Sequence, residues 1–425
     1  MLAIWRVWKS SKHCSGVNDM AEQHEKALVP QIRFTGFTDP WEQRKLDEVA
    51  SKRIEKNTNG IKETFTNSAE HGIVSQLDYF DHDITNDANI GNYSVVYPDD
   101  FVYNPRISTI APCGPINRNK LGRNGVMSPL YTVFSVDDVI NKLYLEHYFK
   151  TNRWHQFMFL EGNSGARSDR FSISDSTFFE MPIQCPVLEE QELIASFFDR
   201  LDTLITLHQR KYDKLCVLKK SMLDKMFPKG GSLYPEIRFA GFTDPWEQRK
   251  LGQHLKLSRE LGHTGVDARK LTVKLWGKGV VEKTDLYGGS AQTQYYIRHA
   301  GQFMYGKLDF LHAAFGVVPD KLDCFESTLD SPAFDIEGLD SSFLLNLVTQ
   351  EDFYLKNGNI ANGSRKAKRI HEETFLNMEI RAPELVEQRR IGAFLDRLDS
   401  LITLHQRKLE LLRNIKKSML DKMFV

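Results

Sequence analysis

Two short polar loops combine glycine with clustered arginine and lysine, a pattern typical of backbone that approaches a phosphate. The first loop runs from Gly162 to Arg170 and the second from Asn362 to Arg369. Glycine permits a close backbone approach, and the guanidinium fork of arginine fits the acceptor edge of guanine. The candidate DNA-contacting residues of the two loops are Arg167, Arg170, Arg365, Lys366, Lys368 and Arg369. A solvated charged turn gives the same pattern, because short basic loops are common.

Two further stretches carry weaker versions of this pattern. An Asn-rich basic stretch offers Arg118, Lys120 and Arg123 as DNA contacts, although a plain loop explains it equally well. In the second half of the chain, Lys307 is a candidate contact that lies between Tyr305 and Phe310. Alternating aromatic residues of this kind favour a buried strand over a binding surface.

Catalytic and metal-binding motifs are missing from the sequence. Adenine amino-methyltransferases carry Asn or Asp followed by two prolines and an aromatic residue, whereas Asp39-Pro40-Trp41 and Asn104-Pro105-Arg106 have one proline each. No glycine-rich nucleotide loop is present. The five cysteines form no CxxC pair, so we expect neither a metal site nor disulfides, and a reducing cytoplasm. No apolar run reaches the roughly 20 residues of a membrane span. We therefore expect a cytoplasmic protein that is not an enzyme and holds no cofactor.

Two segments of the chain occur twice. Residues 30–46 and 235–251 differ at two of seventeen positions, and residues 199–227 and 396–424 are identical at 22 of 29 positions. The material between the repeats has a similar length in both halves but shares only sparse landmarks. This predicts one frame that carries two unlike heads.

The second repeat predicts a long amphipathic helix in each half. Apolar residues recur at steps of four and three, which is a heptad pattern that requires a partner. We expect the two helices to pair antiparallel, with His208 facing His405, although each histidine also fits a polar residue that only sets the register. The predicted seam consists of Ile194, Phe198, Leu201, Ile205, His208 and Leu215 in the first helix, and Ile391, Leu395, Leu398, Ile402, His405 and Leu412 in the second.

The repeats divide the chain into six segments. The predicted class is α+β, with two mixed α/β recognition domains in a pseudo-twofold arrangement, joined by two long antiparallel coiled-coil helices. The segments are an N-terminal extension (1–29) that is disordered or a start-site artefact, domain 1 (30–187), a central helix (188–227), a linker (228–234), domain 2 (235–384) and a C-terminal helix (385–425).

From Pro30 onward the chain resembles the specificity subunits of type I restriction-modification systems. The motifs are the duplicated Gly-Phe-Thr-Asp-Pro-Trp-Glu-Gln-Arg-Lys-Leu, the Pro-x4-Gln entry to each helix at Pro186 and Pro383, and Phe-Leu-Asp-Arg-Leu-Asp-Ser-Leu-Ile-Thr-Leu. The resemblance implies a non-catalytic reader of double-stranded DNA, with target-recognition domains and a helical spacer. It also implies two modification subunits that bind S-adenosylmethionine and methylate adenine. Restriction subunits, which use ATP and Mg²⁺, complete the nuclease.

A protein-interaction scaffold with no DNA function is the alternative interpretation. The 56 basic and 56 acidic side chains balance, whereas simple nucleic-acid binders usually have a high pI. Selection of a bipartite motif from random duplex DNA, with the modification subunit and its cofactor present, would separate the two.

Overall fold

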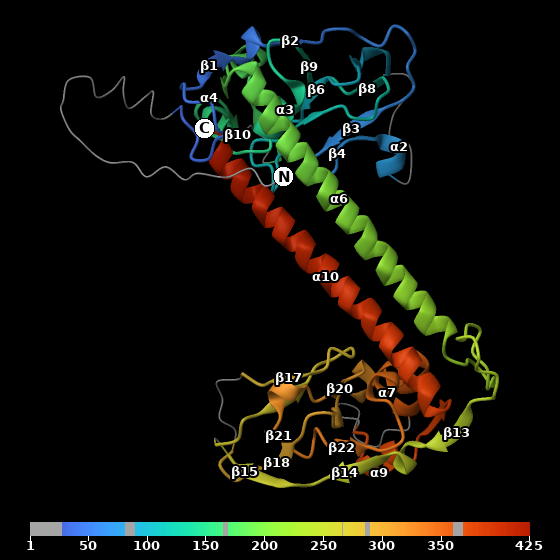
Figure 1. Ribbon diagram of the computed structural model, residues 1–425. Helices are drawn as coiled ribbons and strands as arrows, with labels where there is room; N and C mark the ends of the chain where they lie inside the picture. Colours follow the sequence, from blue (N-terminus) through green and yellow to red (C-terminus); the bar gives the residue numbers. More distant parts are fainter. Residues whose placement is uncertain (1–27, 81–89, 165–168, 266, 285–289, 360–368) are drawn as a thin grey trace, which may run out of the picture. The chain divides into compact units, whose positions relative to one another are not determined.

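The computed structural model of the chain describes residues 28–80, 90–164, 169–265, 267–284, 290–359 and 369–425 (Figure 1). The chain divides into two compact units. Unit 1 contains residues up to His208 together with Lys408–Val425, and unit 2 contains Gln209–Arg407. Each of the two long helices, α6 (Leu188–Lys225) and α10 (Leu385–Met423), contributes one part to unit 1 and the other part to unit 2.

Unit 1 is a set of short antiparallel strands with small helices at their ends. Its strands are β1 (Glu42–Lys45), β2 (Ala50–Lys52), β3 (Phe65–Ser68), β4 (Gly72–Ser75), β5 (Ser94–Val96), β6 (Phe101–Tyr103), β7 (Ile116–Arg118), β8 (Gly125–Met127), β9 (Thr132–Val136), β10 (Asn163–Ser164), β11 (Phe171–Ser172) and β12 (Pro182–Cys185). Its short helices are α2 (Gln76–Tyr79), α3 (Lys142–Tyr148), α4 (His155–Glu161) and α5 (Asp175–Phe179).

Unit 2 is built in the same way. Its strands are β13 (Glu247–Lys250), β14 (Leu255–Ser258), β15 (Leu261–Thr264), β16 (Leu271–Val273), β17 (Val280–Glu282), β18 (Gln294–Arg298), β19 (Phe303–Tyr305), β20 (Phe315–Val317), β21 (Phe325–Ser327), β22 (Ala333–Ile336) and β23 (Glu379–Ala382). Its short helices are α7 (Ser341–Val348), α8 (Glu351–Gly358) and α9 (Glu372–Leu376), and a 3-10 turn, η4 (Phe310–His312), lies between β19 and β20.

Each unit contains a four-stranded sheet of the same topology. The strand order is β2-β9-β6-β7 in unit 1 and β14-β22-β19-β20 in unit 2, with antiparallel neighbours throughout. The strands β6 and β19 are buried along their whole length, as expected for strands covered on both faces. The prediction of mixed α/β domains is therefore confirmed in both units.

The first repeated segment pairs with the strand before each long helix. In unit 1, β1 pairs with β12, and in unit 2, β13 pairs with β23. The tryptophan that precedes each strand, Trp41 or Trp246, is 1% exposed and lies in the core of its unit. Burial of this large aromatic side chain anchors the repeated segment in each unit.

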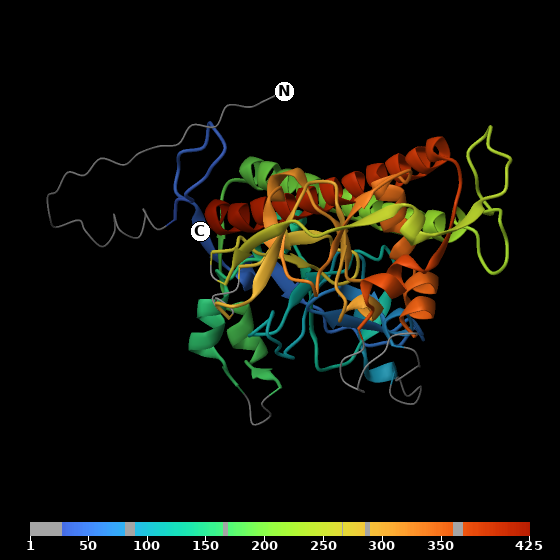
Figure 2. The same cartoon turned by 90° about the horizontal axis from the view of Figure 1, so that it is seen from below.

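The long helices pack in opposite directions within each unit. In unit 1, the first turns of α6 lie beside the last turns of α10 (Figures 1 and 2), and Phe198 and Phe424 share one core. Asp202 of α6 forms an ion pair with Lys416 of α10. In unit 2, the later turns of α6 lie beside the earlier turns of α10, and Lys219 Nζ lies 2.6 Å from Asp399 Oδ1. The helices are therefore antiparallel, as predicted.

The predicted seam residues lie in the cores of the two units. Ile194, Phe198 and Leu201 are buried in unit 1, and Leu412 packs against the same core. In unit 2 the buried members are Ile391, Leu395 and Leu398, and Leu215 packs against that core. Ile205 and Ile402 are half-buried.

His208 and His405 belong to different units, and their predicted pairing stays a prediction.

Among the described residues, no helix is long and apolar enough to cross a bilayer.

Candidate nucleic-acid interface

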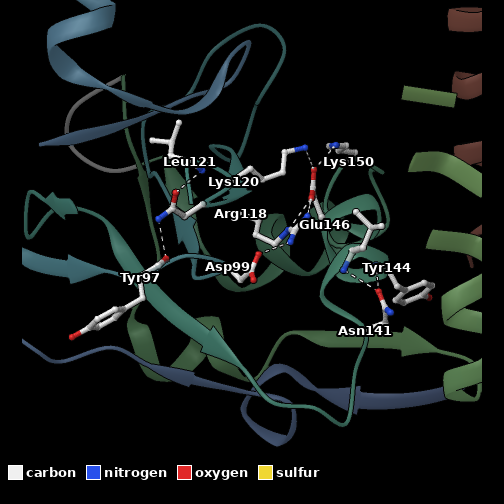
Figure 3. A network of polar contacts seen from close by, with 11 residues as sticks. Tyr97, Asp99, Arg118, Lys120, Leu121, Asn141, Tyr144, Glu146 and Lys150 are labelled. Carbon is white, nitrogen blue, oxygen red and sulfur yellow. Dashed lines mark hydrogen bonds and ion pairs between the residues drawn. The ribbon is translucent and has the colours of Figure 1, made fainter. Parts of the chain in front are cut away.

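Arg118, a predicted DNA contact, lies in a buried ion-pair network of unit 1 (Figure 3). Its guanidinium donates to Asp99 Oδ1 at 2.6 Å and to Glu146 Oε2 at 2.9 Å, and its side chain is 16% exposed. Glu146 belongs to α3, which Asn141 caps by accepting hydrogen bonds from the amides of Leu143 and Tyr144. A guanidinium held on two carboxylates is not available to a base edge. The geometry gives Arg118 a structural role, and we leave it out of the proposed interface.

Glu146 is the centre of this network. Lys120 Nζ and Lys150 Nζ both lie 2.9 Å from its Oε1 atom (Figure 3). Burial alone would raise the pKa of this carboxyl, but the ammonium groups of Lys150 and Lys120 outweigh burial and bring the pKa well below its ordinary value. The carboxylate therefore stays ionised and holds β7 to α3.

Lys120 and Arg123 follow β7 at the surface of unit 1. The Lys120 side chain is 58% exposed, although its ammonium contacts Glu146. The Arg123 side chain is 51% exposed, and its Nη2 atom lies 3.0 Å from Glu63 Oε1. The pair of Arg123 with Glu63 is partly exposed and contributes little stability, so Arg123 can exchange a carboxylate for a phosphate at low cost. Lys120, in contrast, is held by the buried Glu146 carboxylate.

Arg170 stands beside an arginine that sequence reasoning missed. An antiparallel bridge joins Arg106 to Arg170, and the amides of Ile107 and Phe171 donate across it to the carbonyls of Asp169 and Pro105. The Arg106 side chain is 71% exposed and lies 3.8 Å from Asp169. In the sequence, Asn104-Pro105-Arg106 was noted only as an incomplete match to the methyltransferase motif. The bridge brings two arginines from distant segments to one edge, which residue spacing does not reveal. Arg167 lies outside the described residues.

Lys307 is buried in unit 2, where its ammonium lies 2.8 Å from Glu372 Oε1 and its side chain is 8% exposed. This geometry agrees with the buried-strand alternative, and we do not include Lys307 in the proposed interface. Arg369 remains at the surface, 46% exposed, with Nη1 3.6 Å from Asp330 Oδ1. Arg365, Lys366 and Lys368 lie outside the described residues.

Comparison with known proteins places this arrangement in a family. The family described as "Type I restriction modification DNA specificity domain" matches residues 38–216 and 334–414, which together make up more than half of the chain. The chain belongs to this family. A curated relative, the specificity subunit of the type I restriction enzyme MjaVIII from Methanocaldococcus jannaschii, is 24% identical over 71% of this chain and 74% of its own length. The family resemblance inferred from the sequence is confirmed.

A solved structure supports the fold. The S subunit of a type I restriction-modification system from M. genitalium matches with a TM-score of 0.51 and 13% identity, over 93% of this chain and 99% of that chain. This likeness shows the shared fold, in agreement with the predicted pair of α/β domains and long helices.

The same buried ion pair occurs in both halves of this specificity-subunit chain. It fixes the repeated frame, which consists of the repeated segments 30–46 and 235–251 and the two long helices. The Arg33 guanidinium donates to both oxygens of Glu190 at 2.8 Å, and Arg238 donates to both oxygens of Glu387 at 2.7 Å. Both glutamate side chains are 0% exposed. Spacing in the sequence did not assign a partner to Glu190. The repeated Ile-Arg-Phe at residues 32–34 and 237–239 was the available indication of its arginine partner.

One set of potential metal ligands occurs in the described part of the chain. His299, Asp323 and Cys324 place ligand atoms within 4.8 Å of one another. His299 also lies 2.9 Å from Glu260, and the Cys324 thiol donates to Asp323. The sequence predicted no metal site because no CxxC or similar spacing marks these residues. All three groups lie at or near the surface and already satisfy one another by hydrogen bonds, so no chemistry follows from them.

Proposed function

We propose that the chain reads an asymmetric, bipartite site in duplex DNA, with one half-site for each recognition domain and helices α6 and α10 setting the gap. The observation that carries this proposal is a repeated frame with unlike surfaces. The frame contacts of Arg33 with Glu190 and of Arg238 with Glu387 are the same in both units. The exposed cations differ between the units. Different surfaces on one frame suit two different half-sites.

The exposed part of the repeated frame suits docking of two copies of one partner. Strands β1 and β13 have the same sequence, Glu-Gln-Arg-Lys, and their side chains are almost all exposed. Internal packing therefore does not account for their identity, whereas one partner protein that binds twice would. We infer that this partner is the modification subunit, which would supply S-adenosylmethionine chemistry on adenine. Restriction subunits would supply the ATP- and Mg²⁺-dependent steps, and this chain would contribute no catalytic group.

Genome-wide mapping of methyladenine tests the proposal. The host and a strain that lacks only this chain are compared, with the modification subunit retained in both. We expect one asymmetric motif of two short elements, separated by a fixed gap, that disappears when this chain is absent. A second experiment selects random duplexes with the assembled complex and S-adenosylmethionine. Recovery of no preferred sequence in either experiment would overturn the proposal and favour the protein-interaction scaffold.

A further inference from the structure

We propose that the β16–β17 hairpin of unit 2 is a DNA-contacting element and that Trp276, at its tip, packs against the bases or sugars of the duplex. This inference rests on the proposed function and names one contact within it.

Trp276 has a backbone conformation that its side chain disfavours. Its φ is +60°, in the left-handed region that a bulky residue rarely adopts. Such strain persists only where the surroundings fix the backbone, and it gathers at binding sites. Trp276 is also 57% exposed, whereas Trp41, Trp154 and Trp246 are buried. Burial therefore does not compensate for the strained backbone.

The rest of unit 2 fixes the hairpin tip. The amides of Trp276 and Gly277 donate to the carbonyls of His312 and Ala313 at 2.8 Å. Ala313 itself has a φ of +48°. In the turn of the hairpin, just before β17, the backbone of Gly279 would lie 2.8 Å from a Cβ added to Gly316 of β20, so the two backbones pack directly (β17 and β20 in Figure 1). These contacts fix the backbone that carries the indole, which lowers the entropic cost of using Trp276 as a contact.

The side chains around the indole have the chemistry of a phosphate-rich partner. Lys274 and Lys278 flank it in sequence, both exposed, and neither side chain has a hydrogen bond or ion pair within the described residues. The imidazole of His312 packs edge-on against the indole at 5.6 Å. Asp309 Oδ1 lies 3.9 Å from the Nδ1 atom of this histidine. Two unpaired cations beside an exposed aromatic ring fit a duplex, where cations bind phosphates and the ring packs on bases or sugars.

The test uses the assembled complex of this chain with its modification subunits. Binding is measured to a duplex that carries the mapped site and to two duplexes with one half-site scrambled. Trp276→Ala should lower affinity for the intact site by roughly ten-fold or more. On one of the two scrambled duplexes, the variant and the wild type should bind alike. Lys274→Ala with Lys278→Ala should weaken all duplexes and reduce the salt slope by about two.

Trp276→Gly separates a contact from a structural role. Glycine accepts the left-handed conformation, so this variant should melt at the same temperature as the wild type or higher, and should still bind the intact site roughly ten-fold more weakly. Tyr234→Ala removes another exposed aromatic side chain of unit 2 and should leave binding unchanged. A large fall in the melting temperature of Trp276→Gly would show that the indole serves folding, and would overturn the inference.

The outcomes distinguish this inference from the proposed function. A wild-type complex that does not prefer the intact site would contradict the proposed function itself. A selective wild type with an equally selective Trp276→Ala would contradict only the role of the hairpin. A variant that fails to assemble with the modification subunits, yet binds DNA normally once assembled at high concentration, would assign the hairpin to a protein interface and also overturn the inference.

Discussion

His147 is a fully buried histidine of α3 whose two ring nitrogens have no hydrogen-bond partner in the described structure. Burial, and then repulsion from the Lys150 ammonium, lower its pKa to about 3, so the ring is neutral in the folded chain. The corresponding helix of unit 2 has Asn346 at the same place, six residues after the capping residue. Asn346 Nδ2 donates to the Ser342 carbonyl. Asparagine is therefore the residue that unit 2 itself places at the position of His147, and it is the substitution to test there.

We predict that His147→Asn reduces the acid sensitivity of unit 1. Because the pKa of His147 is lower in the folded than in the unfolded chain, only the unfolded chain gains a proton as pH falls below about 6.5. The wild type should lose about 1.4 kcal/mol more stability than the variant between pH 7.5 and pH 5.5. Urea unfolding at both pH values measures this difference. His71→Asn, at an exposed site, is the control and should behave like the wild type. Equal pH dependence of the wild type and His147→Asn would contradict the prediction.

The buried pair of Arg33 with Glu190 connects the first repeated segment to the start of α6. The amide of Ile32 also donates to the Lys422 carbonyl of α10 at 3.0 Å, and Ile237 repeats this bond with Lys225 in unit 2. Each repeated segment is therefore held between the start of one long helix and the end of the other. Loss of a single partner from such a buried pair leaves an uncompensated charge.

We predict that Arg33→Ala destabilises unit 1 by about 3–5 kcal/mol, because Glu190 would remain buried without its partner. Hydrogen exchange should accelerate in residues 28–46 and in the first turns of α6, while the equivalent residues 233–251 of unit 2 stay protected. Arg238→Ala should give the mirror result. Glu42→Gln removes an exposed pair with Arg44 and should cost at most about 1 kcal/mol. Unchanged exchange in Arg33→Ala would show that the pair does not anchor the segment.

Sequence patterns predicted the elements of the frame better than its contacts. Heptad spacing identified both long helices, because apolar periodicity directly reflects the buried face. Periodicity did not reveal that Phe424 reaches the core of unit 1 and contacts Trp41. Nor did spacing separate Arg118 and Lys307, whose cationic groups are held in ion pairs away from solvent, from Arg123, which stays exposed. The environment of a charged side chain depends on tertiary contacts between distant segments, and local sequence does not encode them.

At the scale of the whole molecule, the order of segments in the chain explains why the two units are interdependent. The C-terminal Met423 and Phe424 complete the core of unit 1, although they follow unit 2 in sequence. Met226 and Phe227, at the end of the first helix, lie in the core of unit 2. A duplication in which each helix serves both copies keeps the frame nearly identical, because a change in one helix alters both cores. The segments between the repeats are free of this constraint, which is consistent with their divergence.

This shared use of the helices makes the length of the gap in the DNA site a testable property. If α6 and α10 set the gap as proposed, seven residues added to both helices, after His208 and after His405, should preserve the heptad register. The two helices would lengthen together by roughly 10 Å. At about 3.4 Å per base pair, the gap between the methylated half-sites should widen by about three base pairs while both half-site sequences stay the same. Methyladenine mapping in cells with the lengthened chain measures this change.

The insertion in α6 alone is the control for this prediction. One lengthened helix would move the ion pairs of Asp202 with Lys416 and of Lys219 with Asp399 out of register with each other, because each pair joins α6 to α10. We therefore expect loss of specific methylation from the single insertion and retention from the double one. A double insertion that methylates the original site with its original gap would show that the helices do not set the spacing. Recognition of one contiguous half-site would instead contradict the bipartite reading of DNA.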